Sequence, residues 1–231
     1  MKIQLRLISL ALLLLAPLRP VAAADAVAVV AAHDFGKWEK EIAAYEQADL
    51  AAPPPKGAVL FIGSSHCRRW TTLAQDFSPH QVINRGFGGS AIMDATHFAP
   101  RIIFPYAPRA IYLRAGGNDL SGLKRTVEQV FADYLEFVAT VHAKLPNTDI
   151  IFISNPPSVK RWAQHEKEKA VNTRISEYVQ GKAHLRYIEI YDLLLDANGQ
   201  PRPELLVEDK LHFTAETYRL IADRVRPDLA K

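Results

Sequence analysis

Short apolar runs and amphipathic segments alternate along most of the chain. The apolar runs are rich in β-branched and aromatic residues and are bounded by Gly, Pro, Asn, Asp or Ser, which is typical of buried strands. Between them, apolar residues recur at every third or fourth position, which predicts helices. Strands are expected over residues 58–62, 81–84, 109–114, 149–154 and 185–190.

The predicted helices separate these strands, and one of them precedes the first strand. Thr126 and Gln129 fit a capping box at the start of the longest helix, and Pro53–Pro55 form a stiff linker before the first strand. Strands that alternate with helices predict an α/β fold, in which helices cover both faces of a five-stranded parallel sheet in three layers. The helices are expected over residues 34–49, 66–77, 92–98, 126–145, 162–180 and 213–225.

The first 24 residues have the pattern of a secretory signal peptide. Lys2 and Arg6 precede an apolar run over residues 7–16, and three alanines follow at residues 22–24. The apolar run is short for a membrane span, although a retained signal anchor is the alternative. We therefore expect residues 1–24 to be removed and the protein to be exported, to the periplasm or out of the cell.

The remaining chain predicts one domain of ordinary size. Residues 25–57 form an N-terminal helix and linker, and residues 58–231 form the main domain. Without the signal, whose three basic residues are Lys2, Arg6 and Arg19, 25 basic residues face 25 acidic ones, so the charge gives no support for nucleic-acid binding. Cys67 is the only cysteine, which excludes an internal disulfide and indicates a packed side chain.

Ser65 follows the first predicted strand directly. The segment Val59–Ser65 reads as a buried strand that ends at Gly63 and leads into a helix. Ligands of open α/β sheets bind at the carboxyl ends of the strands, and helix amino ends provide free N–H donors. Ser65 is thus a candidate nucleophile, and the alternative is a simple helix cap.

Asp209 and His212 stand three residues apart before the last predicted helix. At this spacing a carboxylate can fold back onto an imidazole and hold it in one tautomer, as a general base requires. A surface or capping pair is the alternative. Competing histidines lie in or beside predicted strands and helices, where packed or solvated roles are expected; they are His66, His97, His142 and His184.

Four sequence blocks together resemble the SGNH (GDSL-type) hydrolases. The blocks are Gly63–Ser65, Asn84–Ser90, Gly116–Asp119 and Asp209–His212, and their order and spacing are similar to those of the family. The resemblance extends from residue 58 to residue 225 and is strongest to single-domain members similar to the α subunits of platelet-activating-factor acetylhydrolase. It implies a flavodoxin-like three-layer fold. The chain has Ser64 where the Gly-Asp-Ser pattern has Asp.

The resemblance also implies a role for each block. Ser65 would be the nucleophile, His212 the general base and Asp209 the residue that orients it. The backbone N–H groups of Ser65 and Gly89 would form an oxyanion hole with the side-chain amide of Asn118. Glycine allows close backbone approach and an amide donates without charge, so the residue types suit these roles. A tight turn at Gly89 and a left-handed turn at Asn118 are the alternatives.

These residues predict a serine esterase that hydrolyses acyl esters through an acyl-enzyme and needs no cofactor. No His, Asp, Glu or Cys cluster has metal-ligand spacing. An acyltransferase or thioesterase would use the same residues, and a non-catalytic module that binds envelope polysaccharide is the alternative from another class. The substrate can be a small molecule, a glycan or a lipid, and the oligomeric state is open. Arg161 and Trp162 either line the pocket or lie on the surface.

Overall fold

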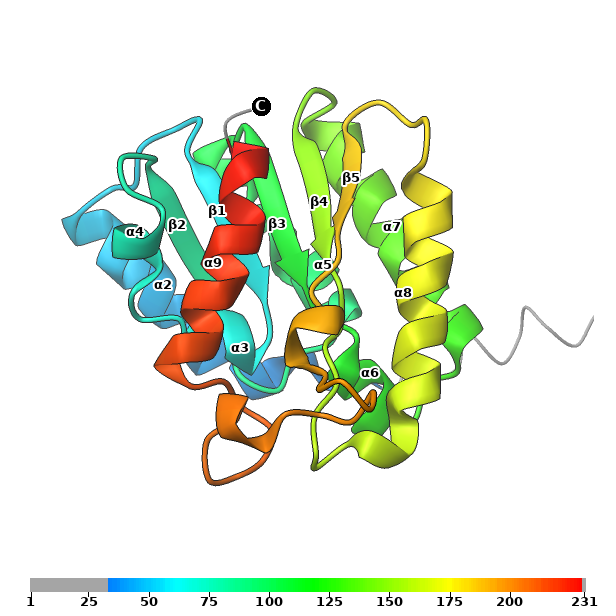
Figure 1. The fold of residues 1–231 in the computed structure, drawn as a ribbon. Helices are drawn as coiled ribbons and strands as arrows, with labels where there is room; N and C mark the ends of the chain where they lie inside the picture. The colour runs from blue at the N-terminus through cyan, green and yellow to red at the C-terminus, as the bar shows by residue number, and fades with distance from the viewer. Residues whose placement is uncertain (1–32, 230–231) are drawn as a thin grey trace, which may run out of the picture. The chain divides into compact units, whose positions relative to one another are not determined.

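A five-stranded sheet organises the computed structural model, which describes residues 33–229 (Figure 1). Two compact units divide the chain after Asp34, and the sheet belongs to the second. The strands are all parallel and follow the order β2-β1-β3-β4-β5. They are β1 (Val59–Gly63), β2 (Val82–Gly86), β3 (Ala110–Arg114), β4 (Asp149–Ile153) and β5 (Leu185–Ile188).

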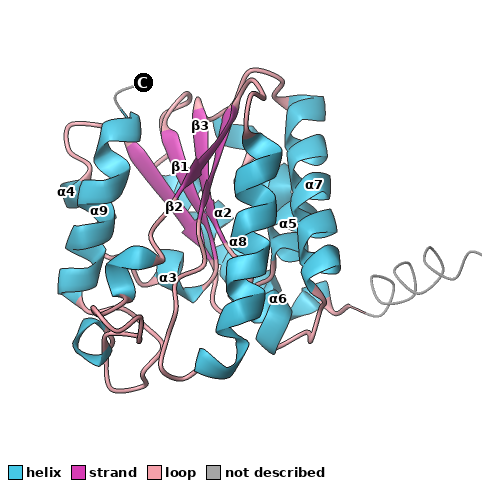
Figure 2. Ribbon diagram, turned by 45° about the vertical axis from the view of Figure 1, so that its right-hand side comes forward, coloured by secondary structure: helices cyan, strands magenta, loops and turns pink. Residues whose placement is uncertain are grey.

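Helices cover both faces of the sheet, as Figure 2 shows with the sheet turned. The longer helices are α2 (Glu39–Ala51), α5 (Ile92–Ile102), α7 (Val127–Lys144), α8 (His165–Val179) and α9 (Ala215–Leu229). The short ones are α3 (Ser65–Arg68), α4 (Leu73–Asp76) and α6 (Gly117–Ser121). Single 3₁₀ turns lie at η1 (Phe35–Trp38), η2 (Phe104–Tyr106), η3 (Trp162–Gln164), η4 (Asp192–Leu194) and η5 (Pro203–Leu205).

Alternate residues of each central strand enter different cores. Leu60 and Ile62 of β1 pack in the core shared with α2, α5, α7 and α8, whereas Phe61 packs in the core shared with α4 and α9. All five residues of β1 are buried, as expected for the centre of a parallel sheet. The predicted three-layer α/β/α architecture is therefore confirmed.

The segment expected as one helix over residues 66–77 forms two short helices instead. Trp70 lies between them, and its indole N–H donates to Asp76 Oδ2 at 2.6 Å. Thr72 Oγ1 donates to the same oxygen at 2.7 Å. The chain leaves the helix because this turn buries Trp70 against Phe61 and Phe77, a tertiary contact that helical periodicity does not reveal.

Several other helix bounds also differ from the prediction; α5, expected over residues 92–98, continues through Pro100 to Ile102. Helix α9 continues past Pro227 to Leu229, because the buried Leu229 and the contact of Asp228 with Tyr112 hold its last turn (Tyr112 Oη to Asp228 Oδ2, 2.8 Å). A proline this close to a helix end removes a single hydrogen bond. Asn118, for which a left-handed turn was the alternative, lies instead in the short helix α6 and has no positive φ.

None of the helices in residues 33–229 has the length and hydropathy needed to cross a bilayer. The predicted signal, residues 1–24, lies outside the described residues.

Candidate active site

Ser65 stands at the junction between β1 and α3. The turn before it needs a glycine: Gly63 has φ +143°, and a Cβ there would lie 2.0 Å from the carbonyl oxygen of Arg114 on β3. Ser64 is extended and its N–H donates to the same oxygen at 3.3 Å. The chain therefore stays close to β3 at the end of β1 and then turns, which leaves Ser65 half-buried at the carboxyl edge of the sheet.

Asp209 and His212 lie in the loop before α9. Asp209 Oδ1 accepts the backbone N–H groups of Leu211 at 3.0 Å and His212 at 2.9 Å. Its Oδ2 lies 2.5 Å from His212 Nδ1. The loop is anchored at its tip by Lys210, whose carbonyl accepts from Lys160 N at 3.0 Å. The carboxylate is thereby fixed on both oxygens and oriented toward the imidazole.

The imidazole connects this loop to the serine. His212 Nε2 lies 2.9 Å from Ser65 Oγ, although the residues are 147 positions apart in the sequence. The structure thus brings Ser65, His212 and Asp209 into one hydrogen-bonded row. If Asp209 is ionised, Nδ1 carries the proton and Nε2 is free to accept the hydroxyl proton of Ser65.

The electrostatics of Asp209 favour its ionised form. Partial burial raises the pKa of this carboxyl, but the hydrogen bonds from the backbone and ring of His212 and from the Leu211 N–H outweigh burial. The net result is a pKa well below the ordinary value for aspartate. The carboxylate therefore stays charged at neutral pH and stabilises a positive charge on His212.

His66, the histidine next to Ser65, has both ring nitrogens engaged. Arg114 Nη1 lies 2.6 Å from Nδ1, and Nε2 lies 3.1 Å from the carbonyl oxygen of Leu211. Because arginine only donates, Nδ1 accepts and Nε2–H donates to Leu211. Burial, and next the charge of Arg114, lower the pKa of His66 well below its usual value. His66 is thus a neutral link between α3 and the loop that carries His212.

The other competing histidines have different partners. His97 stacks on Phe35 with ring centroids 3.9 Å apart. His142 Nε2 lies 3.0 Å from the carbonyl oxygen of Thr148, and His184 Nδ1 lies 2.8 Å from Asp149 Oδ1. Asp149 begins β4, so the last pair belongs to the amino edge of the sheet, opposite the edge that carries Ser65.

Hydrogen bonds join the loops that follow β1, β2 and β3. Phe87 N donates to Gly63 O at 2.9 Å, and Asn118 Nδ2 donates to Ser90 O at 2.9 Å. Gly89 lies in the loop after β2 and has φ +79°. It is exposed and is thus open to a ligand. Asn118 is half-buried at the start of α6. Ser65, Gly89 and Asn118 therefore come from three adjoining loops at one edge of the sheet.

Asp119 is fully buried beside Asn118. Its Oδ1 accepts the N–H of Ile92 at 3.0 Å, which joins α6 to the first turn of α5. Burial raises the pKa of Asp119 to about 7; the hydrogen bond from Ile92 opposes this shift, and the nearby carboxylates of Asp133 and Asp94 reinforce it. This carboxyl therefore links α6, which contains Asn118, to the start of α5, which follows the Gly89 loop.

Cys67 and a small cavity lie beside the candidate site. Cys67 is buried, and burial raises the pKa of its thiol to about 12, so it is a poor nucleophile. A cavity of about 10 Å³ lies beside His66 and Leu211 and is lined also by Arg114, Arg161 and Glu168. Its volume suits one water molecule.

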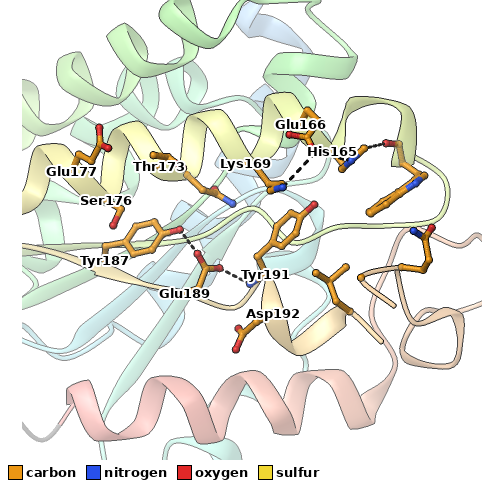
Figure 3. A pocket seen from close by; sticks show the side chains of 15 residues that line it. His165, Glu166, Lys169, Thr173, Ser176, Glu177, Tyr187, Glu189, Tyr191 and Asp192 are labelled. Carbon is orange, nitrogen blue, oxygen red and sulfur yellow. Dashed lines mark hydrogen bonds and ion pairs between the residues drawn. The ribbon is translucent and has the colours of Figure 1, made fainter. Parts of the chain in front are cut away.

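A wider groove of about 660 Å³ runs along α8 and contains none of the candidate triad (Figure 3). Trp162 lines it together with polar and acidic side chains. Within it, Glu189 accepts from Tyr187 Oη at 2.7 Å and from the backbone N–H of Tyr191. Both oxygens of the Glu189 carboxylate thus accept hydrogen bonds from neighbouring residues of the protein.

Among residues 33–229, no three His, Cys, Asp or Glu side chains gather closely enough to hold a metal ion. Sequence reasoning gave no role to Arg114, which lies in a fully buried strand, and left the place of Arg161 open. Arg161 reaches the candidate site: its Nη2 donates to Asn118 Oδ1 at 2.8 Å.

The sequence matches the model of the GDSL-like lipase/acylhydrolase family over residues 57–220. Comparison with curated proteins gives no match. A Streptococcus pneumonia protein provisionally named a platelet activating factor is similar in structure, with a TM-score of 0.74 and 21% identity over 90% of this chain and 100% of that one. A GDSL-like lipase from Bacteroides thetaiotaomicron has a TM-score of 0.68 and 18% identity over 85% and 97% of the two chains.

A family 3 carbohydrate esterase from Talaromyces cellulolyticus has a TM-score of 0.57 and 17% identity over 75% of this chain and 96% of that one. At these identities the structures show a shared fold, and the family match covers most of the chain. The protein therefore belongs to the GDSL-like lipase/acylhydrolase family.

Proposed function

We propose that the protein is a serine esterase that hydrolyses acyl esters through an acyl-enzyme on Ser65. The observation that carries this proposal is the row of atoms from Ser65 Oγ through His212 to Asp209, with separations of 2.9 and 2.5 Å. A hydroxyl is a weak nucleophile by itself and needs an adjacent base that a third group orients. Family membership supports acyl transfer as the chemistry.

In the acylation step, Ser65 Oγ forms a bond to the carbonyl carbon of the ester while its proton passes to His212 Nε2. Asp209 stabilises the imidazolium that forms. The carbonyl oxygen becomes an oxyanion, which the N–H groups of Ser65, Gly89 and the Asn118 side chain would hold. Collapse of this intermediate breaks the ester bond, and His212 gives its proton to the departing alcohol.

In the deacylation step, water attacks the acyl carbon and gives one proton to His212. The carboxylic acid leaves as that proton returns to Ser65 Oγ, so the enzyme is regenerated without a cofactor. General base action contributes roughly 10²–10⁴ in rate, and each oxyanion donor about 10²–10³.

The proposed substrates are acyl esters of small molecules, glycans or lipids. One structural neighbour is named an acetyl esterase (TM-score 0.57, 17% identity over 75% of this chain and 96% of that one), so short acyl groups are the first to test. For the cellular location, we infer export from the signal pattern in residues 1–24. Amino-terminal sequencing of the protein from its host tests this: a mature start near residue 25 supports export, and an intact Met1 contradicts it.

Hydrolysis of p-nitrophenyl esters from acetate to octanoate tests the proposed activity. Ser65→Ala and His212→Ala are expected to remove nearly all turnover, whereas Ser64→Ala, the neighbouring serine, serves as the matched control and is expected to retain most of it. Unchanged turnover in Ser65→Ala would refute the proposal. Added alcohol acceptors separate a transferase, in which product ester would replace the released acid.

A further inference from the structure

Arg161 and Ser90 bind opposite ends of the side-chain amide of Asn118. It lies on the loop between β4 and α8, and its Nη2 donates to Asn118 Oδ1 at 2.8 Å. The other end of the amide donates from Nδ2 to Ser90 O at 2.9 Å. Two loops that are distant in the sequence therefore hold one amide group between them.

These two contacts allow a single orientation of the amide. A guanidinium only donates hydrogen bonds, and a carbonyl oxygen only accepts them, so Oδ1 must face Arg161 and Nδ2 must face Ser90. The terminal torsion of asparagine has broad minima and does not select an orientation by itself. With one N–H bonded to Ser90 O, the second N–H of Nδ2 is left to donate elsewhere.

We propose that Arg161 is a positioning residue that keeps this second N–H of Asn118 directed at the oxyanion. The proposal rests on the proposed function, in which Asn118 is an oxyanion donor. Arg161 acts through Asn118 and is not assigned any contact with the substrate. The positive charge of Arg161 next to Oδ1 also polarises the amide, which strengthens the hydrogen bonds that Nδ2 donates.

The surroundings keep the guanidinium in place. Gly117, next to Asn118, leaves room for it, since a Cβ on Gly117 would lie 3.0 Å from Arg161 Nη1. Glu168 faces the same cavity and is only 3% exposed; burial raises the pKa of its carboxyl, and the hydrogen bond from Gln164 and the charges of Arg114 and Arg161 oppose this shift. Burial lowers the pKa of Arg161 and Glu168 counteracts this, so the side chain remains a cation at neutral pH. The backbone is anchored by the bond from Arg161 N to Ser158 Oγ at 3.3 Å.

A double-mutant cycle tests this role with p-nitrophenyl acetate as the probe. The variants are Arg161→Met, which keeps the aliphatic stem without donors, Asn118→Ala, and the two combined. Arg161→Met is expected to lower kcat about tenfold or more, within the roughly 10²–10³ that one oxyanion donor contributes, and to leave KM unchanged. In the Asn118→Ala background the same substitution is expected to change kcat less than about twofold.

Arg174→Gln is the matched control, because Arg174 is an exposed arginine on α8 that pairs with Glu128. It is expected to leave kcat and KM unchanged. Circular dichroism and thermal unfolding establish that each variant is folded. If Arg161→Met is unfolded, the cycle is repeated with Arg161→Lys, which keeps the charge but not the planar fork; its smaller loss must again vanish with Asn118→Ala.

The inference is overturned if Arg161→Met retains the wild-type kcat, or if its loss persists in full in the Asn118→Ala background, which would mean that Arg161 acts independently of the amide. Ser65→Ala is measured in the same assay, so that a failure of the proposed esterase function can be told from a failure of the role of Arg161. Activity that survives Ser65→Ala refutes the proposed function, whereas an inactive Ser65→Ala with a normal Arg161→Met refutes the role of Arg161 alone.

Discussion

Asp209→Asn is a near-isosteric change whose effect follows from the hydrogen bonds around the carboxylate. Two backbone N–H groups, those of Leu211 and His212, donate to Oδ1 at 3.0 and 2.9 Å. An asparagine must turn its own oxygen toward these donors, because its NH₂ group would oppose them. The NH₂ group then lies where Oδ2 stood, 2.5 Å from His212 Nδ1.

This orientation reverses the tautomer of His212. The amide would donate to Nδ1, so the ring proton would move to Nε2, which faces Ser65 Oγ at 2.9 Å. A protonated Nε2 cannot accept the serine proton. In a Ser-His-Asp protease the same Asp-to-Asn change imposes the wrong tautomer and lowers kcat by about 10⁴. We expect a fall on the order of 10⁴-fold here as well, and a smaller one than in Ser65→Ala.

Steady-state hydrolysis of p-nitrophenyl acetate near pH 7.5 measures the effect. Asp209→Ala is the informative comparison, because it removes the carboxylate without imposing the wrong tautomer and should lose less kcat than Asp209→Asn. Arg69→Gln is the control for a change of charge beside Asp209, since Arg69 lies 3.8 Å from Asp209 in a partly exposed pair, and such pairs have weak interaction energies. A loss below about tenfold in Asp209→Asn, or a larger loss in Asp209→Ala, would refute the reasoning on tautomers.

Two further predictions concern stability. Because burial raises the folded-state pKa of Asp119 to about 7 from an ordinary 3.8, the native protein holds the extra proton between these values and this group's contribution to stability falls as pH rises through that window. As the pH is raised from 5 to 8, the unfolding free energy of Asp119→Asn, measured in urea, should therefore increase relative to that of wild type. A difference that does not change with pH would contradict this. Gly63→Ala, whose Cβ would lie 2.0 Å from the carbonyl oxygen of Arg114, should lose on the order of 3 kcal/mol or more of unfolding free energy. Gly57→Ala, also at positive φ but with no atom within 4 Å of the added Cβ, should lose only about 1 kcal/mol, and equal losses would be the contrary result.

Much of the fold could be predicted because short apolar runs and period-3.6 patterns are local. Strand β1 was expected over residues 58–62 and occupies Val59–Gly63, and the capping box at Thr126 starts α7, where Gln129 N donates to Thr126 Oγ1 at 3.2 Å. Parallel pairing follows from the alternation with helices. Helix bounds differ from the prediction where tertiary contacts compete with local preference, for example at Trp70 and at Pro227.

The candidate site could be predicted in part for the same reason. Ser65 follows a strand-ending glycine, and Asp209 and His212 form a short-range pair, so each is visible in the sequence. The contact of Arg114 with His66 spans 48 positions, and that of Arg161 with Asn118 spans 43. No local pattern indicates such pairs, because the strand order and the path of the loops decide them. The catalytic roles themselves stay predictions.

Covalent labelling of the full-length enzyme tests the central claim most directly. A fluorophosphonate forms a stable bond with an activated serine oxygen and releases fluoride, and intact mass with peptide mapping locates the adduct. The account predicts one adduct per chain, on Ser65, that is absent in Ser65→Ala and forms far more slowly in His212→Ala. Labelling at another residue, or an unlabelled Ser65 in a protein that hydrolyses p-nitrophenyl acetate, would contradict it.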